Sequence, residues 1–318
     1  MRRLARALAA LALLLAGARA EAYCRSAACP ERDDGTTDGH VCDPPQFDDC
    51  GLELQWRQPC IGFNVQRGAS SQIDYATAEA LLAQAFATWT SVDCGGLGSP
   101  SIAVFDLGAV SCGKVEYNQH AGNTNVLVFR DDGWPHDDDG SGTADTLALT
   151  TVTYDVEKGD IYDADIEVNT ANDTFTTTDT PGELDVNLLS VLTHEAGHLL
   201  GLAHSPEAGA TMFPDYTRGT TTLRVLSPDD EMAICVAYPP ERKPVGECTG
   251  IPRHGFAPEC NDEQTYVKCA ASPADGGSAP GLGALALGAA VTFARRRARR
   301  AAIRWSSNRS PVRSSSNE

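Results

Sequence analysis

Three histidines in the second half of the chain stand at a spacing that suits metal chemistry. His194 and His198 are four residues apart, so a helix would present both imidazoles on one face. Gly201 would let the chain turn sharply after the helix, and that turn would bring His204 round as a third nitrogen ligand. Three neutral imidazoles leave one position of a tetrahedral zinc ion open to water. This pattern predicts a catalytic rather than a closed structural zinc site.

Glu195 follows the first of these histidines directly and is the candidate general base. It would take a proton from a zinc-activated water and later deliver it to the leaving group. The full pattern, His-Glu-x-x-His-x-x-Gly-x-x-His, has a chance frequency on the order of one in 10⁵ in a chain of this composition. Histidines that only make hydrogen bonds on a helix are the alternative interpretation.

Helices must position these groups. The first two histidines fall in a helix expected from Leu184 to about Leu200, with Gly201 at its end. Another helix is expected to start at Ser227-Pro228-Asp229-Asp230, because serine at the N-cap, proline at the next position and acids in the first turn form a strong start signal.

Upstream of these helices, an amphipathic helix and several strands are expected. The helix carries an apolar stripe at helical spacing, formed by Ala78, Leu81, Leu82, Ala85, Phe86 and Trp89. Short segments rich in β-branched residues predict five strands at Ile61–Val65, Ser101–Phe105, Val126–Arg130, Leu147–Tyr154 and Ile161–Val168. The order predicts an α+β fold with a twisted, mostly parallel five-stranded sheet and three helices.

The charge of the chain is unevenly distributed. The formal net charge is −18, but residues 21–269 hold 41 acidic and only 13 basic residues, a net charge of −28. So acidic a region would repel phosphates, which excludes a nucleic-acid binder. The carboxylates of this region would suit the binding of calcium.

The N-terminus reads as an export signal. Residues 1–20 combine three arginines before an apolar run with small residues at Ala18 and Ala20, as a removed secretory signal does. A membrane anchor is the alternative, but the apolar run is too short to cross about 30 Å of hydrocarbon. We expect a Cys-rich extension at 21–59, a catalytic domain at 60–240 and a Cys-containing extension at 241–269.

The C-terminal residues 270–318 combine a Pro/Gly/Ala/Ser-rich linker, an apolar run from Gly281 to Ala294 and an arginine cluster that starts at Arg295. This order predicts a sorting or anchoring tail that attaches the protein to a membrane or cell surface. Together with Cys269, the segment resembles the MYXO-CTERM sorting tails of myxobacterial surface and secreted proteins. A disordered basic tail is the alternative.

Export would make the cysteines disulfide candidates. With Cys269 assigned to the sorting signal, an even number remains and permits five bridges: Cys24, Cys29, Cys42, Cys50, Cys60, Cys94, Cys112, Cys235, Cys248 and Cys260. Connectivity cannot be deduced from the sequence, although Cys94 with Cys112 and Cys248 with Cys260 would form local loops.

The surroundings of the histidines resemble the metzincin metallopeptidases, and specifically the matrixin branch. Ser205 follows the third histidine as it does in matrixins, and Ala210–Tyr216 is similar to their Met-turn and the Pro-x-Tyr segment after it. Leu226–Tyr238 resembles their last helix and Ala85–Trp89 the end of their first. The resemblance covers roughly Cys60 to Pro240.

The resemblance implies a metzincin fold and a secreted zinc endopeptidase that acts on proteins or peptides. Met212 would form the floor beneath the zinc. Pro214 and Tyr216 would shape the S1′ pocket, and Asp230 would brace the Met-turn. We expect a monomer.

Two departures from the matrixin pattern matter. Leu149 and Tyr162 stand where matrixins place histidines for a structural zinc, so a second zinc is not expected. The Pro-Arg-Cys-Gly motif of the matrixin propeptide is absent, so any latency would need another device.

Two acidic segments are candidate calcium sites. One is the loop Asp131–Gly140, and the other holds Asp160, Asp163, Asp165 and Glu167. Hard oxygen ligands near glycine turns suit Ca²⁺, and the matrixin resemblance implies calcium in this region. A solvated acidic loop is the alternative, because no spacing here fits an EF-hand.

Two other functions remain open. One is a calcium-stabilised surface adhesin that keeps a metallopeptidase scaffold without turnover, although a ligand-only site would not need Glu195 as a base. The other is a peptidoglycan hydrolase. The sequence does not identify the substrate, because pocket depth depends on the loop Thr217–Val225.

Overall fold

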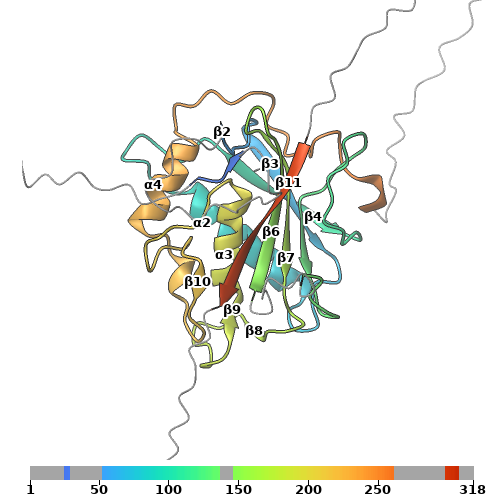
Figure 1. Cartoon of the computed structure of the whole chain (residues 1–318), viewed down its shortest axis with the longest axis vertical. Coiled ribbons are helices and arrows are strands. Elements are labelled where there is room, and N and C mark those ends of the chain that lie inside the picture. The colour runs from blue at the N-terminus through green and yellow to red at the C-terminus, as the bar shows by residue number, and fades with distance from the viewer. Residues whose placement is uncertain (1–24, 29–51, 137–145, 261–297, 308–318) are drawn as a thin grey trace, which may run out of the picture.

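The computed structural model describes residues 25–28, 52–136, 146–260 and 298–307 (Figure 1). The expected signal segment, the acidic run 137–140, four of the ten candidate disulfide cysteines and most of the C-terminal tail lie outside these residues.

One sheet forms the centre of the structure, with the strand order β10-β11-β6-β7-β5-β3-β4. Its strands are β3 (Cys60–Gln66), β4 (Ala103–Val110), β5 (Val126–Phe129), β6 (Thr146–Asp155), β7 (Ile161–Val168), β10 (Asp215–Tyr216) and β11 (Ala298–Ser307). Strands β4, β3, β5 and β7 are parallel, whereas β6 is antiparallel to β7. The expected five-stranded, mostly parallel sheet is thus confirmed, and β11 and β10 extend it beyond β6.

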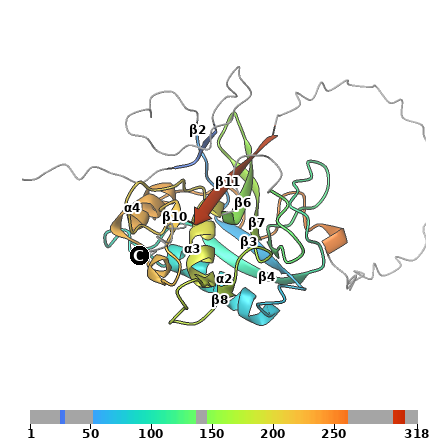
Figure 2. The same ribbon diagram turned by 60° about the horizontal axis from the view of Figure 1, so that its bottom comes forward.

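In the described part of the chain, three α-helices accompany the sheet: α2 (Tyr75–Thr90), α3 (Leu188–Leu199) and α4 (Pro228–Ala237). Two short strand pairs and two 3-10 helices complete the described elements: β1 (Ala27–Ala28) with β2 (Leu52–Glu53), β8 (Phe175–Thr176) with β9 (Val186–Asn187), η3 (Thr222–Arg224) and η4 (Pro258–Cys260). Helices α2 and α3 lie side by side against one face of the sheet (Figure 2).

The main core lies between this helical layer and the sheet. The stripe of α2 packs inward as the sequence predicts, with Leu82, Phe86 and Trp89 almost fully buried. Asp74 begins the helix by accepting a hydrogen bond from Thr77 N at 3.0 Å. The same core includes Leu54 and Trp56, which precede the expected domain start at residue 60.

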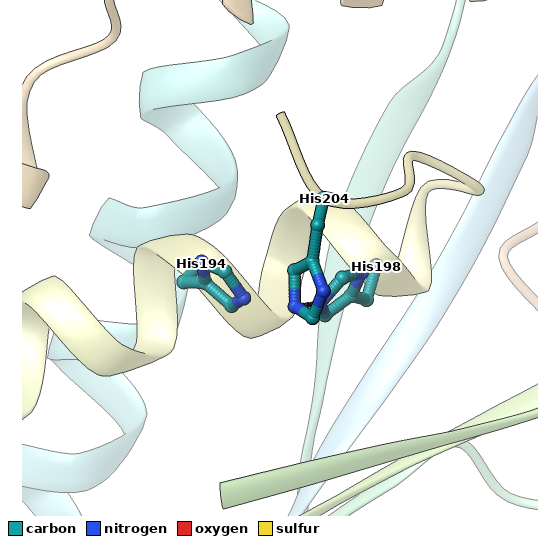
Figure 3. Close-up of side chains that lie close together, drawn as sticks. All are labelled: His194, His198 and His204. Atoms are coloured by element: carbon teal, nitrogen blue, oxygen red, sulfur yellow. Dashed lines mark hydrogen bonds between the residues drawn. The ribbon is translucent and has the colours of Figure 1, made fainter. Parts of the chain in front are cut away.

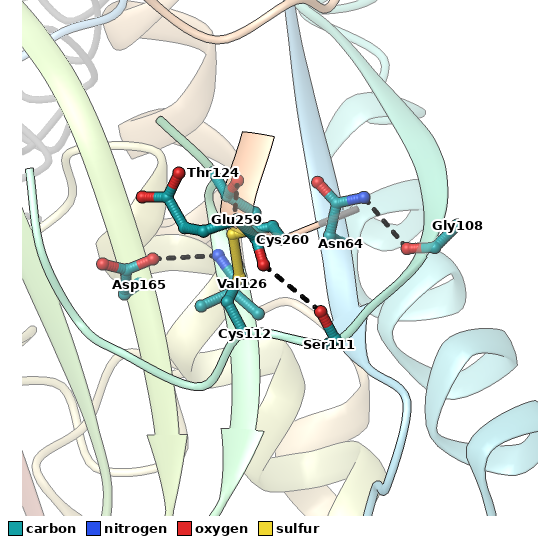
Figure 4. Close-up of a disulfide and its surroundings, with 9 residues drawn as sticks. All are labelled: Asn64, Gly108, Ser111, Cys112, Thr124, Val126, Asp165, Glu259 and Cys260. Carbon is teal, nitrogen blue, oxygen red and sulfur yellow. Dashed lines mark hydrogen bonds between the residues drawn. A yellow bond between two sulfur atoms is a disulfide. The ribbon is translucent and has the colours of Figure 1, made fainter. Parts of the chain in front are cut away.

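The opposite face of the sheet carries a smaller core. Val110, Val126 and Val128 pack there against Ala257 and Cys260, near the end of the described C-terminal extension. The disulfide between Cys260 and Cys112 ties this extension to the sheet (Figure 4).

Three disulfides form among the described cysteines, and they join distant segments: Cys60–Cys248, Cys94–Cys235 and Cys112–Cys260. The local pairs suggested by the sequence, Cys94 with Cys112 and Cys248 with Cys260, are therefore wrong. The sheet and α4 bring together residues 141 to 188 positions apart, and proximity along the chain did not indicate this.

Across the described residues, no helix has both the length and the apolar character needed to cross a bilayer.

Candidate metal centre

Helix α3 carries the first two histidines through the middle of the protein. It begins at Leu188, four residues later than the sequence predicts, because Val186–Asn187 forms β9 and Asn187 caps the helix by accepting from Ser190 N at 3.0 Å. All twelve of its residues are buried. The helix is therefore a rigid platform for its side chains.

A tight turn after α3 reverses the chain toward the third histidine. Gly201 has a φ of +87°, and a Cβ there would lie 2.6 Å from the carbonyl oxygen of Leu54. Its N–H donates to His198 O at 2.9 Å, and the next N–H donates to Gly197 O at 3.0 Å. This left-handed helix end requires glycine and directs the chain back toward His204.

The three imidazoles converge on one position (Figure 3). Ring centroids lie 4.6 Å apart for His194 and His198, 4.8 Å for His198 and His204, and 5.3 Å for His194 and His204. One potential ligand atom of each residue lies within 4.8 Å of the others. Within the described part of the chain, this is the one group of three or more histidine, cysteine or acidic side chains close enough to share a metal ion.

Backbone carbonyls fix the two helical imidazoles. Nδ1–H of His194 donates to Thr211 O at 2.6 Å, and Nδ1–H of His198 donates to Leu202 O at 2.9 Å. These bonds select the tautomer that leaves Nε2 for a metal. Burial lowers the pKa of both rings well below its usual value and that of His204 to about 4, so all three are neutral ligands at neutral pH.

Glu195 directly follows His194 in α3 and is fully buried. Thr150 of β6 donates its hydroxyl to Oε2 of this carboxyl, while Oε1 has no hydrogen-bond partner among the described residues. Burial raises the pKa of Glu195 to about 8 when no cation is near. A buried carboxylate oxygen without a partner is costly unless an ion or a water occupies the space beside it.

The donor set fits zinc. Three neutral imidazole nitrogens from a rigid helix and a fixed turn match its preferred ligands and leave a coordination position open. The lone oxygen of Glu195 is then available to a water.

Met212 packs beneath the helix at the level of the triad. A Cβ at Gly197, between the two helical histidines, would lie 2.3 Å from Sδ of Met212 and 2.8 Å from Cζ2 of Trp89. Trp89 Nε1 also donates to Thr193 O at 2.7 Å. The absence of a side chain at Gly197 therefore allows the close contact of α3 with α2 and with the segment that follows the third histidine.

Asp230 anchors this segment from the first turn of α4. Its carboxylate accepts from Thr211 N at 2.7 Å and from Met212 N at 3.0 Å, and it also accepts from the N–H and the hydroxyl of Ser227 at 2.8 Å each. Since Thr211 supplies the carbonyl that orients His194, Asp230 is linked to the metal ligands through one residue.

Tyr216 and Pro214 lie in the strand-like segment just beyond Met212. The Tyr216 hydroxyl donates to Thr220 O at 2.6 Å and accepts from Asn187 N at 2.9 Å, so it joins β10 to the start of α3. Tyr216 is buried and Pro214 is half-buried. The structure thus links Tyr216 to the start of α3, and the role of both residues in a substrate pocket remains a prediction.

The four candidate calcium residues do not all lie together. Asp163, Asp165 and Glu167 alternate along β7 and face away from the main core, whereas Asp160 pairs with Arg57. Glu167 binds Arg130 at 2.7 Å and His136 Nε2 at 2.9 Å.

Asp165 accepts from Val126 N at 2.9 Å (Figure 4). Burial, followed by the charge of Asp163, raises its pKa well above the usual value. These carboxyls compensate their burial partly through protein partners, and calcium here remains a prediction.

Sequence reasoning missed several contributors to the site. Thr150, Gly197 and Asn187 were not singled out, although two of them left a signal. Glycine inside a helix costs stability and indicates a close contact, and asparagine before an apolar helix is a typical N-cap. Nothing in the sequence distinguishes Thr150 from its threonine neighbours in β6.

Comparison with known proteins adds an independent finding. The family model for Matrixin, a peptidase family, matches residues 55–239, which is more than half of the chain.

Individual relatives match over shorter stretches. Interstitial collagenase A of Mus musculus is 40% identical over 80 residues, or 25% of this chain and 16% of the relative. Neutrophil collagenase of Homo sapiens is 39% identical over 75 residues, or 24% and 15%. Metalloendoproteinase 1-MMP of Arabidopsis thaliana is 27% identical over 194 residues, or 59% and 46%. The chain thus covers less than half of the length of each of these relatives.

Proposed function

Because the chain belongs to the matrixin family of metallopeptidases, we propose that it is a secreted zinc-dependent endopeptidase in which Glu195 is the general base. One observation carries the proposal. The fully buried Glu195 has an oxygen without a partner among the described residues, and it directly follows His194, one of three imidazoles that converge on one position. A metal site with a purely structural role would not need such a carboxylate.

His194, His198 and His204 would hold the ion and take no part in proton transfer. A zinc ion there supplies Lewis acidity, which polarises the peptide carbonyl and makes water acidic enough to act as a nucleophile near neutral pH. Thr211 O and Leu202 O keep two of the rings in the ligating tautomer.

Glu195 would move the proton. Oε2 is held by Thr150, so Oε1 is the oxygen that accepts the proton of the attacking water and returns it to the leaving amine. A cation beside this carboxylate favours its ionised form and opposes the effect of burial, which alone raises its pKa to about 8. The buried position excludes bulk water that would compete for the proton.

The substrate class would be proteins or peptides. Pro214 and Tyr216 would shape the pocket for the residue after the cleaved bond, and the segment Thr217–Val225 would set its depth. Met212 would support the ligand cluster from below, and Asp230 would fix the turn that carries it.

Export and attachment are also part of the proposal. Three disulfides between distant segments support an oxidising destination. Residues 1–20 would be removed on secretion. The catalytic domain would span 60–240, between extensions at 21–59 and 241–269. Residues 270–318 would sort or anchor the enzyme, which would be a monomer.

Calcium would bind the acidic segments as a structural ion. The carboxylates of Asp163, Asp165 and Glu167 share one face of β7 and repel one another, and bound Ca²⁺ would relieve that repulsion. Millimolar CaCl2 should then raise the melting temperature more than NaCl at the same ionic strength. The rise with CaCl2 should be smaller in the double variant Asp163→Asn/Asp165→Asn than in the wild type. Equal shifts with both salts would contradict calcium binding.

A peptide library distinguishes the endopeptidase from its two rivals. The zinc-loaded chain should cleave internal bonds of the peptides, and chelation should abolish cleavage until zinc is restored. A surface adhesin would cleave nothing, and a peptidoglycan hydrolase would cut cell-wall peptides alone. Either result would overturn the endopeptidase function.

A further inference from the structure

The C-terminal strand β11 lies in the sheet between β6 and β10, although about 80 residues of sequence separate it from β10. It pairs antiparallel with β6, from Ala298 opposite Asp155 to Trp305 opposite Ala148, and then with Thr146 after a bulge. At its end it pairs in parallel with β10, where Ser306 lies opposite Asp215 and Ser307 opposite Tyr216. Figures 1 and 2 show β11 running beside β6 from one end of this strand to the other.

The two strands that flank β11 are the ones that hold the metal centre. Thr150 of β6 donates to Glu195, and its register partner in β11 is Ile303. On the other side, β10 begins three residues after Met212, in the segment whose Thr211 carbonyl orients His194. The backbone of β11 therefore runs between the supports of the base and the supports of a ligand.

An extended peptide that reaches this centre needs the same edges. The free edge of a strand offers backbone N–H and carbonyl groups, and an added peptide strand gains its affinity from them. Without β11, the ten residues of β6 would be such an edge, beside the carboxyl of Glu195. Because β11 uses this edge, a second peptide cannot pair with it at the same time.

We propose that Ala298–Ser307 is an intramolecular inhibitor that occupies the edge of β6 where a peptide substrate would pair, and that it admits a substrate only after it leaves. The inhibitory role rests on the proposed endopeptidase function, whereas the occupancy of this edge does not. It would give the chain a latency device in place of the missing Pro-Arg-Cys-Gly motif.

The charge of β11 and the length of the chain that precedes it favour β11 as the strand that occupies the edge of β6. The strand sequence contains Arg299, Arg300 and Arg304 and no acid, while residues 21–269 carry a net charge of −28. The 37 residues 261–297 could span roughly 120 Å when extended, which exceeds the reach required within one domain of this size. A tethered strand also meets its site at a higher effective concentration than a free peptide.

The test removes the pairing ability of β11 in the full chain. The variant Ala302→Pro/Ile303→Pro loses two successive N–H donors that point to opposite sides of the strand. The matched control, Ser314→Pro/Ser315→Pro, places the same two prolines beyond the paired residues. Circular dichroism should show equal folding of both variants.

Hydrogen exchange measures occupancy without catalysis. The measurement uses a Glu195→Gln background, which prevents self-cleavage. About half of the β6 amides from Ala148 to Asp155 face β11, and these amides should exchange slowly in the control. The same amides should exchange at least tenfold faster in the β11 variant. Equal exchange in the two proteins would overturn the proposal.

Peptide cleavage measures inhibition in the Glu195 background. The value of kcat/KM for a short peptide should rise at least tenfold in the β11 variant, and a synthetic peptide of residues 298–307 should reverse the rise. Equal rates despite different exchange would overturn the inhibitory role, and so would a purified wild-type chain that mass spectrometry finds cut within 298–307. If no variant cleaves any peptide while exchange still differs, the endopeptidase function fails but the occupancy stands.

Discussion

Replacing Asp230 by asparagine tests how the turn beneath the metal centre is held. Oδ2 of Asp230 accepts three hydrogen bonds, from Thr211 N and from the N–H and hydroxyl of Ser227, and Oδ1 accepts one from Met212 N. Asparagine keeps the shape of the side chain but only one acceptor oxygen. Its NH2 group must then face at least one donor in a site that is 1% exposed.

The cost follows from these four bonds. One buried backbone N–H without a partner costs about 1–3 kcal/mol, and loss of the charge weakens the remaining bonds, for a total of about 2–4 kcal/mol. In a domain of this size, that corresponds to a melting temperature lower by about 4–16 °C. Because Thr211 O orients His194, zinc affinity should also fall by about 10–100-fold.

Calorimetry and a competitive zinc-chelator titration measure the two effects. Asp229→Asn is the matched control, since it removes the same charge from the same helix turn while its partner is Ser205 Oγ at 2.6 Å. The control should change zinc affinity less than threefold. The reasoning is refuted if Asp230→Asn binds zinc as tightly as the control variant or melts at the same temperature.

Three further perturbations have defined outcomes. Gly197→Ala should lower stability by about 1–3 kcal/mol, seen in denaturant melts, because its Cβ would lie 2.3 Å from Met212 Sδ; no effect would contradict the close contact. The protein freed of metal by a chelator should lose stability as the pH falls from 6.5 toward 4. In this range the histidines of the unfolded chain bind protons, whereas the folded His204, with its pKa lowered to about 4, does not. A melting temperature that does not vary with pH would contradict this. The double variant Cys94→Ser/Cys235→Ser should lower the free energy of unfolding by about 2–5 kcal/mol. Mass spectrometry of the secreted wild-type chain should find no free thiol among the ten candidate cysteines. Several free thiols in active protein would contradict the disulfide framework.

The metal-binding triad could be predicted from the sequence because its geometry is local. Helical periodicity places His194 and His198 on one face, and glycine at position 201 allows the left-handed turn toward His204. The five central strands could be predicted for the same reason, since each has its own β-branched pattern.

The rest depends on contacts between distant segments. The disulfide partner of Cys94 is Cys235, which the fold brings near through α4, and no local pattern indicates that pairing. Strand β11 lies in a region whose linker and arginines indicate a sorting tail, and its pairing depends on the free edge of β6. Likewise, Thr150 can donate its hydroxyl to Glu195 only because β6 passes beside α3.

Metal content and turnover of Glu195→Gln, measured on the same sample, test the central claim most directly. Glutamine keeps the size of the side chain and leaves the three histidines intact, so the variant should retain one zinc per chain by mass spectrometry under native conditions. It should lose about 10²–10⁴-fold or more in kcat on a cleavable peptide, whereas Glu231→Gln on the exposed face of α4 should lose nothing. Wild-type cleavage by a zinc-loaded Glu195→Gln protein would contradict the assignment of this residue as the base.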